Sequence, residues 1–302
     1  MSIRVTAFGP GKIILLGEHG VVYGHPALAA PISRGVRAWA EPSDTPELEL
    51  PGGLSAVHRD ALERAFARAV RKAGHPKVSV HLESDLPLSM GLGSSGALAV
   101  AVSRVLLEAK HARPAEARRV EALALEMEKE FHGTPSGVDH TTSARGELLV
   151  YRRGQVRVVK AKRPVKVLVA LVGPRAGTKV TVGALRERQA RWPTRYRRLF
   201  REIGALVGEG AKAAAAGDLP ALGDVMNVNQ GLLNALGLSS DRLEAMVQRL
   251  RRLGALGAKL TGAGGDGGAV IGLFPEPERA VMKLRQEGID CFASQLAGPR
   301  TL

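Results

Sequence analysis

Apolar residues recur at helical spacing in three stretches of the chain. Residues 59–72 are typical of a charged amphipathic helix. Residues 97–108 have apolar positions on one helical face, at Leu98, Val102, Val105 and Leu106. Residues 114–131 also have apolar positions on one helical face, at Val120, Leu123, Ala124, Met127 and Phe131, and Gly133 ends that pattern. The pattern therefore predicts three helices, and the alanine-rich residues 211–216 predict a further helical segment.

Shorter apolar segments predict strands between these helices. Residues 3–8 and 80–82 have this character, and residues 147–152 and 155–160 flank an Arg153-Gly154 turn as a hairpin does. Residues 165–172 form an apolar run typical of a buried strand, which we expect to begin a second domain. The predicted domains are residues 1–163 and 164–302 of a mixed α and β chain.

Composition restricts the environment of the protein. The 302 residues are 45% hydrophobic and 24% charged, with a single cysteine, so an internal disulfide and a cysteine-based metal site are excluded. No segment approaches the roughly 20 apolar residues of a membrane span, and the first residues do not resemble an export signal. We therefore expect a cytoplasmic protein without a membrane partner.

The net charge of +14 raises the question of nucleic-acid binding. Residues 186–201 hold seven arginines interleaved with Trp192, Tyr196 and Phe200. Because these rings recur every four residues, they share one helical face. We expect a solvated arginine face with partly buried rings and no specific nucleic acid as a partner. The alternative is a stacking surface for bases.

Three glycine-rich segments carry the candidate chemistry. They are residues 10–12 running into 17–20, residues 91–96, and residues 262–268. Glycine lets the backbone approach a ligand closely, and successive N–H groups can bind an anion, so several such segments predict a polyphosphate ligand. Residues 91–96 open directly onto the predicted helix 97–108, with Ser94 or Ser95 available to cap it. The Gly-Lys-Ser/Thr ending of a Walker A loop is absent, so a different kind of kinase is indicated.

Two carboxylates also have the positions expected of functional groups. Glu128 lies at the edge of the apolar face of helix 114–131, where a carboxylate must be paired, hydrated or bound to a cation. Asp139 ends the turn-rich residues 134–139, where a turn residue or a helix cap is the simpler interpretation.

Five segments in this order resemble the GHMP small-molecule kinases: residues 10–12, 17–24, 87–96, 132–139 and 259–268. The resemblance runs nearly from end to end. It implies an α+β fold, with an N-terminal domain like the second domain of ribosomal protein S5, a ferredoxin-like C-terminal domain, and an active site in the cleft between them.

The resemblance also implies roles for individual residues. Asp139 and Lys12 match the catalytic pair, in which Asp139 accepts or aligns the hydroxyl proton and Lys12 stabilises the alkoxide and keeps Asp139 ionised. Ser95 and Glu128 match the ligands of Mg²⁺. Glu18, His19 and Thr178 match positions that line the acceptor pocket. The residues that match the nucleotide-binding segments are Pro87, Gly91, Leu92, Gly93, Ser94, Ser95, Gly96, Gly262 and Gly264. Asp266 departs from the usual run of glycines in the third segment.

Within the family, the sequence most resembles enzymes that phosphorylate mevalonate. Galactokinases follow Gly-Glu-His with Thr-Asp, whereas this chain continues with Gly20-Val21. Phosphomevalonate kinases commonly have tyrosine at the position of His19, and the related decarboxylases lack the lysine that matches Lys12. The expected reaction is therefore transfer of phosphate from ATP to the 5-hydroxyl of mevalonate, with Mg²⁺, in isoprenoid biosynthesis.

Alternatives remain at this stage. Another GHMP kinase, acting on phosphomevalonate or a sugar, is one, and a non-catalytic regulator with the same fold is another. The sequence also leaves open whether the protein is a monomer or a homodimer.

Overall fold

A computed structural model describes residues 5–50, 56–87, 90–133, 135–173 and 178–298. The chain divides into two compact units, each built from segments that alternate along the sequence. The first unit contains Met1–Lys12, Ser33–Leu86 and Gly93–Gly146, and the second contains Ile13–Ile32, Pro87–Leu92 and Glu147–Leu302. The predicted domain boundary between residues 163 and 164 stays a prediction, because the two compact units meet at other points along the chain.

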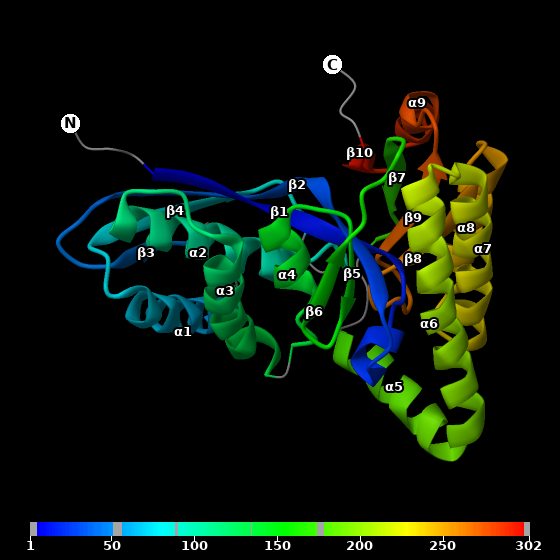
Figure 1. Ribbon diagram of the computed structural model, residues 1–302, viewed down its shortest axis with the longest axis horizontal. Coiled ribbons are helices and arrows are strands. Elements are labelled where there is room, and N and C mark those ends of the chain that lie inside the picture. Colours follow the sequence, from blue (N-terminus) through cyan, green and yellow to red (C-terminus); the bar gives the residue numbers. More distant parts are fainter. Residues whose placement is uncertain (1–4, 51–55, 88–89, 134, 174–177, 299–302) are drawn as a thin grey trace. The chain divides into compact units, whose positions relative to one another are not determined.

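The larger sheet has six strands, in the order β3-β4-β2-β5-β6 with β1 paired to β2 (Figure 1). Its strands are β1 (Val5–Leu16), β2 (Ala27–Pro42), β3 (Glu47–Glu49), β4 (Val78–Ser84), β5 (Leu149–Arg152) and β6 (Gln155–Val158). The predicted strands at 80–82, 147–152 and 155–160 are confirmed. Strand β1 is longer than the predicted residues 3–8, because the first glycine segment continues the strand instead of forming a loop. Gly9 is required there, since a Cβ would lie 1.9 Å from the carbonyl oxygen of Ala97.

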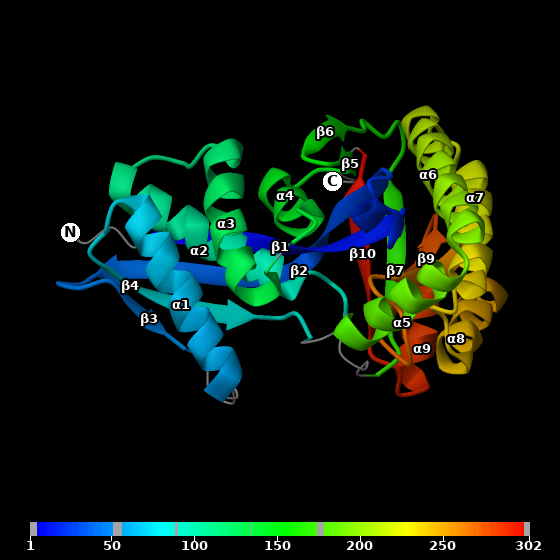
Figure 2. The same ribbon diagram turned by 90° about the horizontal axis from the view of Figure 1, so that it is seen from below.

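The helices of the first unit are α1 (Ala56–Ala73), α2 (Ser94–His111), α3 (Ala117–His132) and α4 (Val138–Arg145). Helices α1, α2 and α3 pack against one another beside strands β2, β3 and β4 (Figures 1 and 2). The three helices predicted from apolar spacing are therefore confirmed. The predicted serine cap is wrong: the N-cap of α2 is Gly93, which has a left-handed φ of 72° and makes no side-chain capping bond. Ser94 and Ser95 are instead the first two residues of the helix.

The second unit contains an antiparallel sheet in the order β10-β7-β9-β8. Its strands are β7 (Val165–Leu171), β8 (Gly257–Thr261), β9 (Ala269–Phe274) and β10 (Cys291–Ala297). Its helices are α5 (Thr178–Arg191), α6 (Pro193–Ala216), α7 (Leu219–Ala235), α8 (Asp241–Arg252) and α9 (Glu278–Gln286). Helices α5–α8 connect β7 to β8, and α9 connects β9 to β10, so the chain follows the β-α-β-β-α-β order of a ferredoxin-like domain, as predicted.

The core of this second unit lies between the sheet and its helices. Leu168 and Val270 from the sheet pack there with Leu233 and Val247 from helices α7 and α8, all fully buried. Helix α7 packs against both α6 and β8, and α8 packs against β8 and β9 (Figure 1). No helix among the described residues is both long and apolar enough to cross a membrane.

The arginine-rich stretch 186–201 is divided between two helices. Helix α5 ends at Arg191 and α6 begins at Pro193, because proline fits the first turn of a helix but cannot donate a bond within one. Trp192 at the break is 47% exposed, so the prediction that it is partly buried is wrong. Tyr196 and Phe200 are buried, as the four-residue spacing predicts.

Candidate active site

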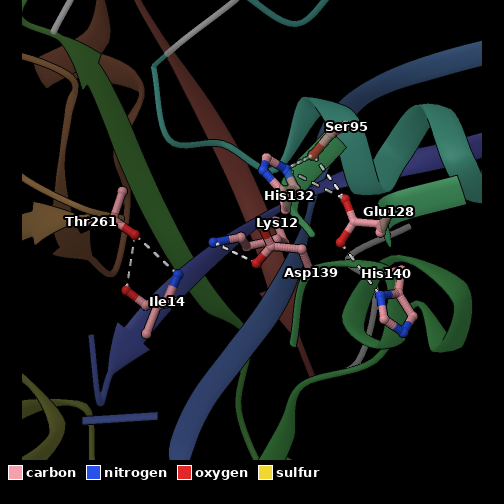
Figure 3. Close-up of polar contacts among 8 residues, drawn as sticks. All are labelled: Lys12, Ile14, Ser95, Glu128, His132, Asp139, His140 and Thr261. Atoms are coloured by element: carbon pink, nitrogen blue, oxygen red, sulfur yellow. Dashed lines mark hydrogen bonds and ion pairs between the residues drawn. The ribbon is translucent and has the colours of Figure 1, made fainter. Parts of the chain in front are cut away.

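Lys12 and Asp139 form an ion pair in the first unit. The Lys12 Nζ lies 3.0 Å from the Asp139 Oδ1, and Figure 3 shows the two side chains pointing toward each other. Strand β1 supplies the lysine and the first turn of helix α4 supplies the aspartate. Asp139 is thus a helical residue and not part of the preceding turn. The pair combines a fixed positive charge with a carboxylate that can accept a proton.

Glycines allow this close arrangement of strand and helices. A Cβ on Gly93 would lie 2.7 Å from the Lys12 Cγ, so the loop before α2 rests on the stem of the lysine. A Cβ on Gly96 would lie 3.0 Å from the main chain of Asp139, so α4 approaches the first turn of α2 closely. The glycine segment 91–96 therefore places the ion pair beside the N-terminus of α2, where free N–H groups stabilise negative charge.

A second cluster surrounds the Glu128 carboxylate. Ser95 donates its hydroxyl to Glu128 Oε1 at 2.8 Å, and His140 Nδ1 lies 3.4 Å from Glu128 Oε2. The ring of His132 also contacts the Ser95 hydroxyl, at 3.0 Å from its Nε2 (Figure 3). Glu128 is 1% exposed, so it lies inside the protein and not at the edge of the apolar face.

This cluster fits a divalent cation that also binds phosphate. A buried carboxylate is costly unless a positive charge compensates it, and the partners of Glu128 among the described residues are one hydroxyl and two imidazoles. No group of three or more His, Cys, Asp or Glu side chains in the described part of the chain could hold a metal alone. A cation at Ser95 and Glu128 would thus take its other ligands from substrate and water, as Mg²⁺ commonly does.

The remaining glycines of the nucleotide-binding prediction lie in the second unit. Gly262 packs against Gly91, since a Cβ there would lie 3.1 Å from the Gly91 carbonyl oxygen. Gly264 has a left-handed φ of 65°, and a Cβ at this position would clash with the carbonyl oxygen of Leu238. Leu92 is 1% exposed and anchors its loop in the core, whereas Pro87 is half-buried. Within the second unit, the start of the second glycine segment therefore lies in contact with the start of the third.

Glu18 and His19 follow strand β1 and are both buried in the second unit. Glu18 forms an ion pair with Lys259 of strand β8, and its other oxygen lies 3.3 Å from the Asn229 Nδ2. His19 Nε2 lies 2.9 Å from the carbonyl oxygen of Ala263, in the third glycine segment. The third predicted pocket residue, Thr178, is the first residue of α5, and its side chain lies outside the described part of the chain.

Helix α6 holds the turn that follows His19. This turn is the short 3-10 helix η1 (Gly20–Tyr23), and the ring of Tyr23 stacks on Phe200 with centroids 4.2 Å apart. The ring of His25 lies against Gly204 one turn further along. Burial lowers the pKa of His25, and the charges of Arg152, Arg153 and Arg201 lower it further. The imidazole beside these arginines is therefore neutral near pH 7.

Sequence reasoning did not identify three residues that support these predicted site residues. They are His140, Asn229 and Lys259. Lys259 begins one of the segments that carry the family resemblance, but nothing along the chain connects it with Glu18. Low exposure combined with a charged or polar side chain is the signal that finds them, and that signal exists only in the folded structure.

Comparison with known proteins agrees with this fold. The family model of the GHMP kinases N terminal domain matches residues 60–147, and that of the GHMP kinases C terminal matches residues 211–289. The chain belongs to the GHMP kinase family. Along nearly its whole length it is similar to mevalonate kinases, with 36% identity to that of Aeropyrum pernix over 98% of this chain and 97% of the relative. The mevalonate kinase of Thermococcus gammatolerans is 34% identical over 92% of each chain.

Solved structures give the same result for the fold. The crystal structure of L. major mevalonate kinase in complex with R-mevalonate matches with a TM-score of 0.85 and 28% identity, over 99% of this chain and 98% of that one. Lactococcus lactis galactokinase complexed with galactose matches with a TM-score of 0.72 and 19% identity, over 99% and 95% of the two chains. Since kinases of different substrates share this fold, the fold alone does not select the acceptor.

Proposed function

We propose that this protein transfers the γ-phosphoryl group of ATP to the 5-hydroxyl of mevalonate, giving 5-phosphomevalonate. The observation that carries the proposal is the Lys12 and Asp139 ion pair beside the N-terminus of α2. Near full-length similarity to mevalonate kinases supports mevalonate as the acceptor.

Asp139 and Lys12 act on the attacking hydroxyl in this proposal. An alcohol is a weak nucleophile until it is aligned and can lose its proton, and the Asp139 carboxylate, with a side chain 29% exposed, is the accessible acceptor. The Lys12 ammonium stabilises the negative charge that develops as that proton leaves. Positioning and charge stabilisation account for most phosphoryl-transfer catalysis, so a fixed pair of this kind suits the reaction.

Residues 91–96 and the N-terminus of α2 would bind the phosphates of ATP, with Gly262 and Gly264 supporting the loop from the third glycine segment. Ser95 and Glu128 would hold Mg²⁺. When bound, that ion neutralises charge on the phosphate oxygens and orients the transferred group. Ser95 joins the two functions, because it lies in the first turn of α2 and also donates to Glu128.

On the acceptor side, His19 and Thr178 would line the mevalonate pocket. Glu18 belongs to the same segment, but its carboxylate is fully buried in an ion pair. We therefore assign Glu18 an indirect role, in which it holds the segment that carries His19.

A coupled assay with purified protein, ATP and Mg²⁺ tests the proposal. The acceptors to compare are mevalonate, 5-phosphomevalonate, galactose and homoserine. Mevalonate should give a kcat/KM at least about 10²-fold above the others, because pocket contacts discriminate acceptors through transition-state binding. Turnover of 5-phosphomevalonate without turnover of mevalonate would overturn the assignment.

A further inference from the structure

A fully buried polar network is built around Glu18, the residue before His19. Glu18 and Lys259 have no exposed side-chain surface, and Asn229 of helix α7 is equally buried. The Lys259 ammonium donates to Glu18 Oε1 and, at 2.6 Å, to the carbonyl oxygen of Leu260. The Asn229 amide donates to Glu18 Oε2. Both oxygens of the carboxylate are thus held by groups from two other elements, β8 and α7.

Stability alone is a weak explanation for this ion pair. Removing two charges from water is costly, and well-packed apolar residues often stabilise a protein as well as a buried pair does. A buried pair does fix geometry, because a charge without its partner cannot remain in the interior. The location of this one, at the residue before His19, indicates which geometry is fixed.

His19 has a backbone conformation that needs such support. Its φ of 58° and ψ of −41° are unusual for a residue with a side chain. Strain of this kind persists only where the surroundings enforce it, and it concentrates at functional sites. Here the Glu18 network holds the residue before His19, and the carbonyl of Ala263 holds the imidazole itself.

Strand β8 fixes the end of β1 at a second point. The hydroxyl of Thr261 accepts from the Ile14 N–H at 3.0 Å and donates to the Ile14 carbonyl at 3.1 Å (Figure 3). Lys259 and Thr261 therefore tie β8 to both ends of the segment 14–18. Since β8 runs directly into Gly262, the same strand also sets the start of the third glycine segment.

We propose that Lys259, together with Asn229, is a positioning residue that holds Glu18 and so fixes His19 for binding the acceptor. The inference rests on the proposed function, in which His19 lines the mevalonate pocket. Lys259 touches neither substrate in this account. Loss of Lys259 acts through the Glu18 carboxylate. Because an uncompensated charge is unstable in the interior, the carboxylate would move toward solvent and displace the neighbouring His19.

The main test compares two variants of the full chain. Lys259→Met removes the Lys259 ammonium from the buried Glu18 carboxylate, and we expect the KM for mevalonate to rise about tenfold or more while the KM for ATP changes less than about twofold. The double variant Glu18→Gln with Lys259→Met carries no charge at either position. Within the described structure the Asn229 Oδ1 has no hydrogen-bond partner, so it can accept from the new amide. We expect its KM for mevalonate to return to within about threefold of wild type.

The control variant is Leu284→Ala, which creates a cavity in the core of the same unit on helix α9. It should lower Tm by an amount comparable with Lys259→Met, roughly 5–10 °C, without changing either KM. If Lys259→Met only lowered Tm and left the KM for mevalonate unchanged, the network would be merely structural and the proposal would be wrong. If Lys259→Met does not fold, Asn229→Ala takes its place, with an expected increase in KM of about threefold.

A second readout does not depend on activity. In protein labelled with ¹⁵N-histidine, the His19 resonances, assigned by their loss in His19→Gln, should shift in Lys259→Met and remain in place in Leu284→Ala. Unshifted His19 resonances in both variants would contradict the positioning role even if the wild type phosphorylates mevalonate. If the wild type shows no mevalonate turnover, the proposed function fails, and the histidine spectra still decide whether Lys259 positions His19.

Discussion

Lys12 is 5% exposed at its side chain, whereas Asp139 is 29% exposed. The ammonium is therefore held within the protein, and only the carboxylate of the pair is open to a substrate hydroxyl. At the scale of single residues, this difference supports the proposal that Asp139 accepts the proton and that Lys12 supplies a fixed charge. Both roles can be tested by changes that preserve side-chain size.

Asp139→Asn should lower kcat by at least about 10² and leave nucleotide affinity little changed, because the amide keeps the shape but cannot accept the proton. Lys12→Met should lower kcat as well. Steady-state kinetics and nucleotide titration measure the two effects. The control is Asp224→Asn on the exposed face of α7, which should behave as wild type. A near-normal kcat for Asp139→Asn would reduce Asp139 to a structural residue of α4.

Glu128→Gln and Ser95→Ala should each raise the Mg²⁺ concentration needed for the half-maximal rate, by about tenfold or more, because each removes one of the two proposed ligands. The measurement is a Mg²⁺ titration at saturating ATP and acceptor. Glu63→Gln on the exposed face of α1 is the matched control. An unchanged Mg²⁺ requirement in both test variants would mean that other groups hold the ion.

At the scale of the elements, glycine determines how closely β1, α2 and α4 approach one another. Gly9 brings β1 against Ala97 of α2, and Gly96 brings α4 against α2. Helix propensity alone would favour alanine at position 96 by up to about 1 kcal/mol. At position 96, close packing of α4 against α2 therefore favours glycine, although helix propensity favours alanine. This position also sets the distance between α2 and Asp139.

Gly96→Ala should lower kcat roughly 3- to 10-fold with little change in Tm, because the new methyl pushes Asp139 by a few tenths of an ångström while the helix itself gains stability. Kinetics and thermal unfolding provide the two measurements. Gly208→Ala in α6 is the control, since a Cβ there meets nothing within 4 Å. It should raise Tm by about 1–4 °C without affecting kcat. A kcat in Gly96→Ala equal to that of the control would show that this approach is not critical.

At the scale of the whole molecule, the charge of +14 favours anionic ligands such as ATP and mevalonate. Of the three rings in the densest arginine stretch, only Trp192 is exposed. Tyr196 and Phe200 are buried, and Phe200 supports Tyr23. The guanidinium groups of Arg191 and Arg195 lie 5.5 and 5.1 Å from the centroid of the exposed Trp192 ring. One ring that already contacts two arginines makes a poor base-stacking platform.

Binding to single-stranded RNA should therefore be weak and should disappear near about 150 mM salt, because it rests on phosphate contacts alone. Fluorescence anisotropy across a salt series measures this. The triple change of Arg195, Arg197 and Arg198 to Glu should abolish the residual binding, whereas Trp192→Ala should leave it nearly unchanged. Submicromolar, salt-resistant binding that depends on Trp192 would indicate a second function for this face.

The sequence by itself determined the family and most of the elements, and it predicted the chemically important residues. Apolar periodicity located α1, α2 and α3, because each helix buries one face and the period is written along the chain. Five ordered motifs identified the GHMP kinases, which the family models and the relatives confirm. The proposed roles of Lys12, Asp139, Ser95 and Glu128 come from the same motifs and stay predictions, although the structure places each pair in contact.

Only the tertiary structure decided which residues are partners and how deeply they are buried. Glu18 and Lys259 are 241 positions apart, and no local pattern connects residues that meet only through the packing of distant segments. The same reason explains why Glu128 is buried and why Gly93, which lies against the stem of Lys12, caps α2 in place of a serine. Periodicity records which face of an element is apolar. Which residues contact that face depends on how the rest of the chain folds. Folding is what brings Lys259 to Glu18, the residue before His19.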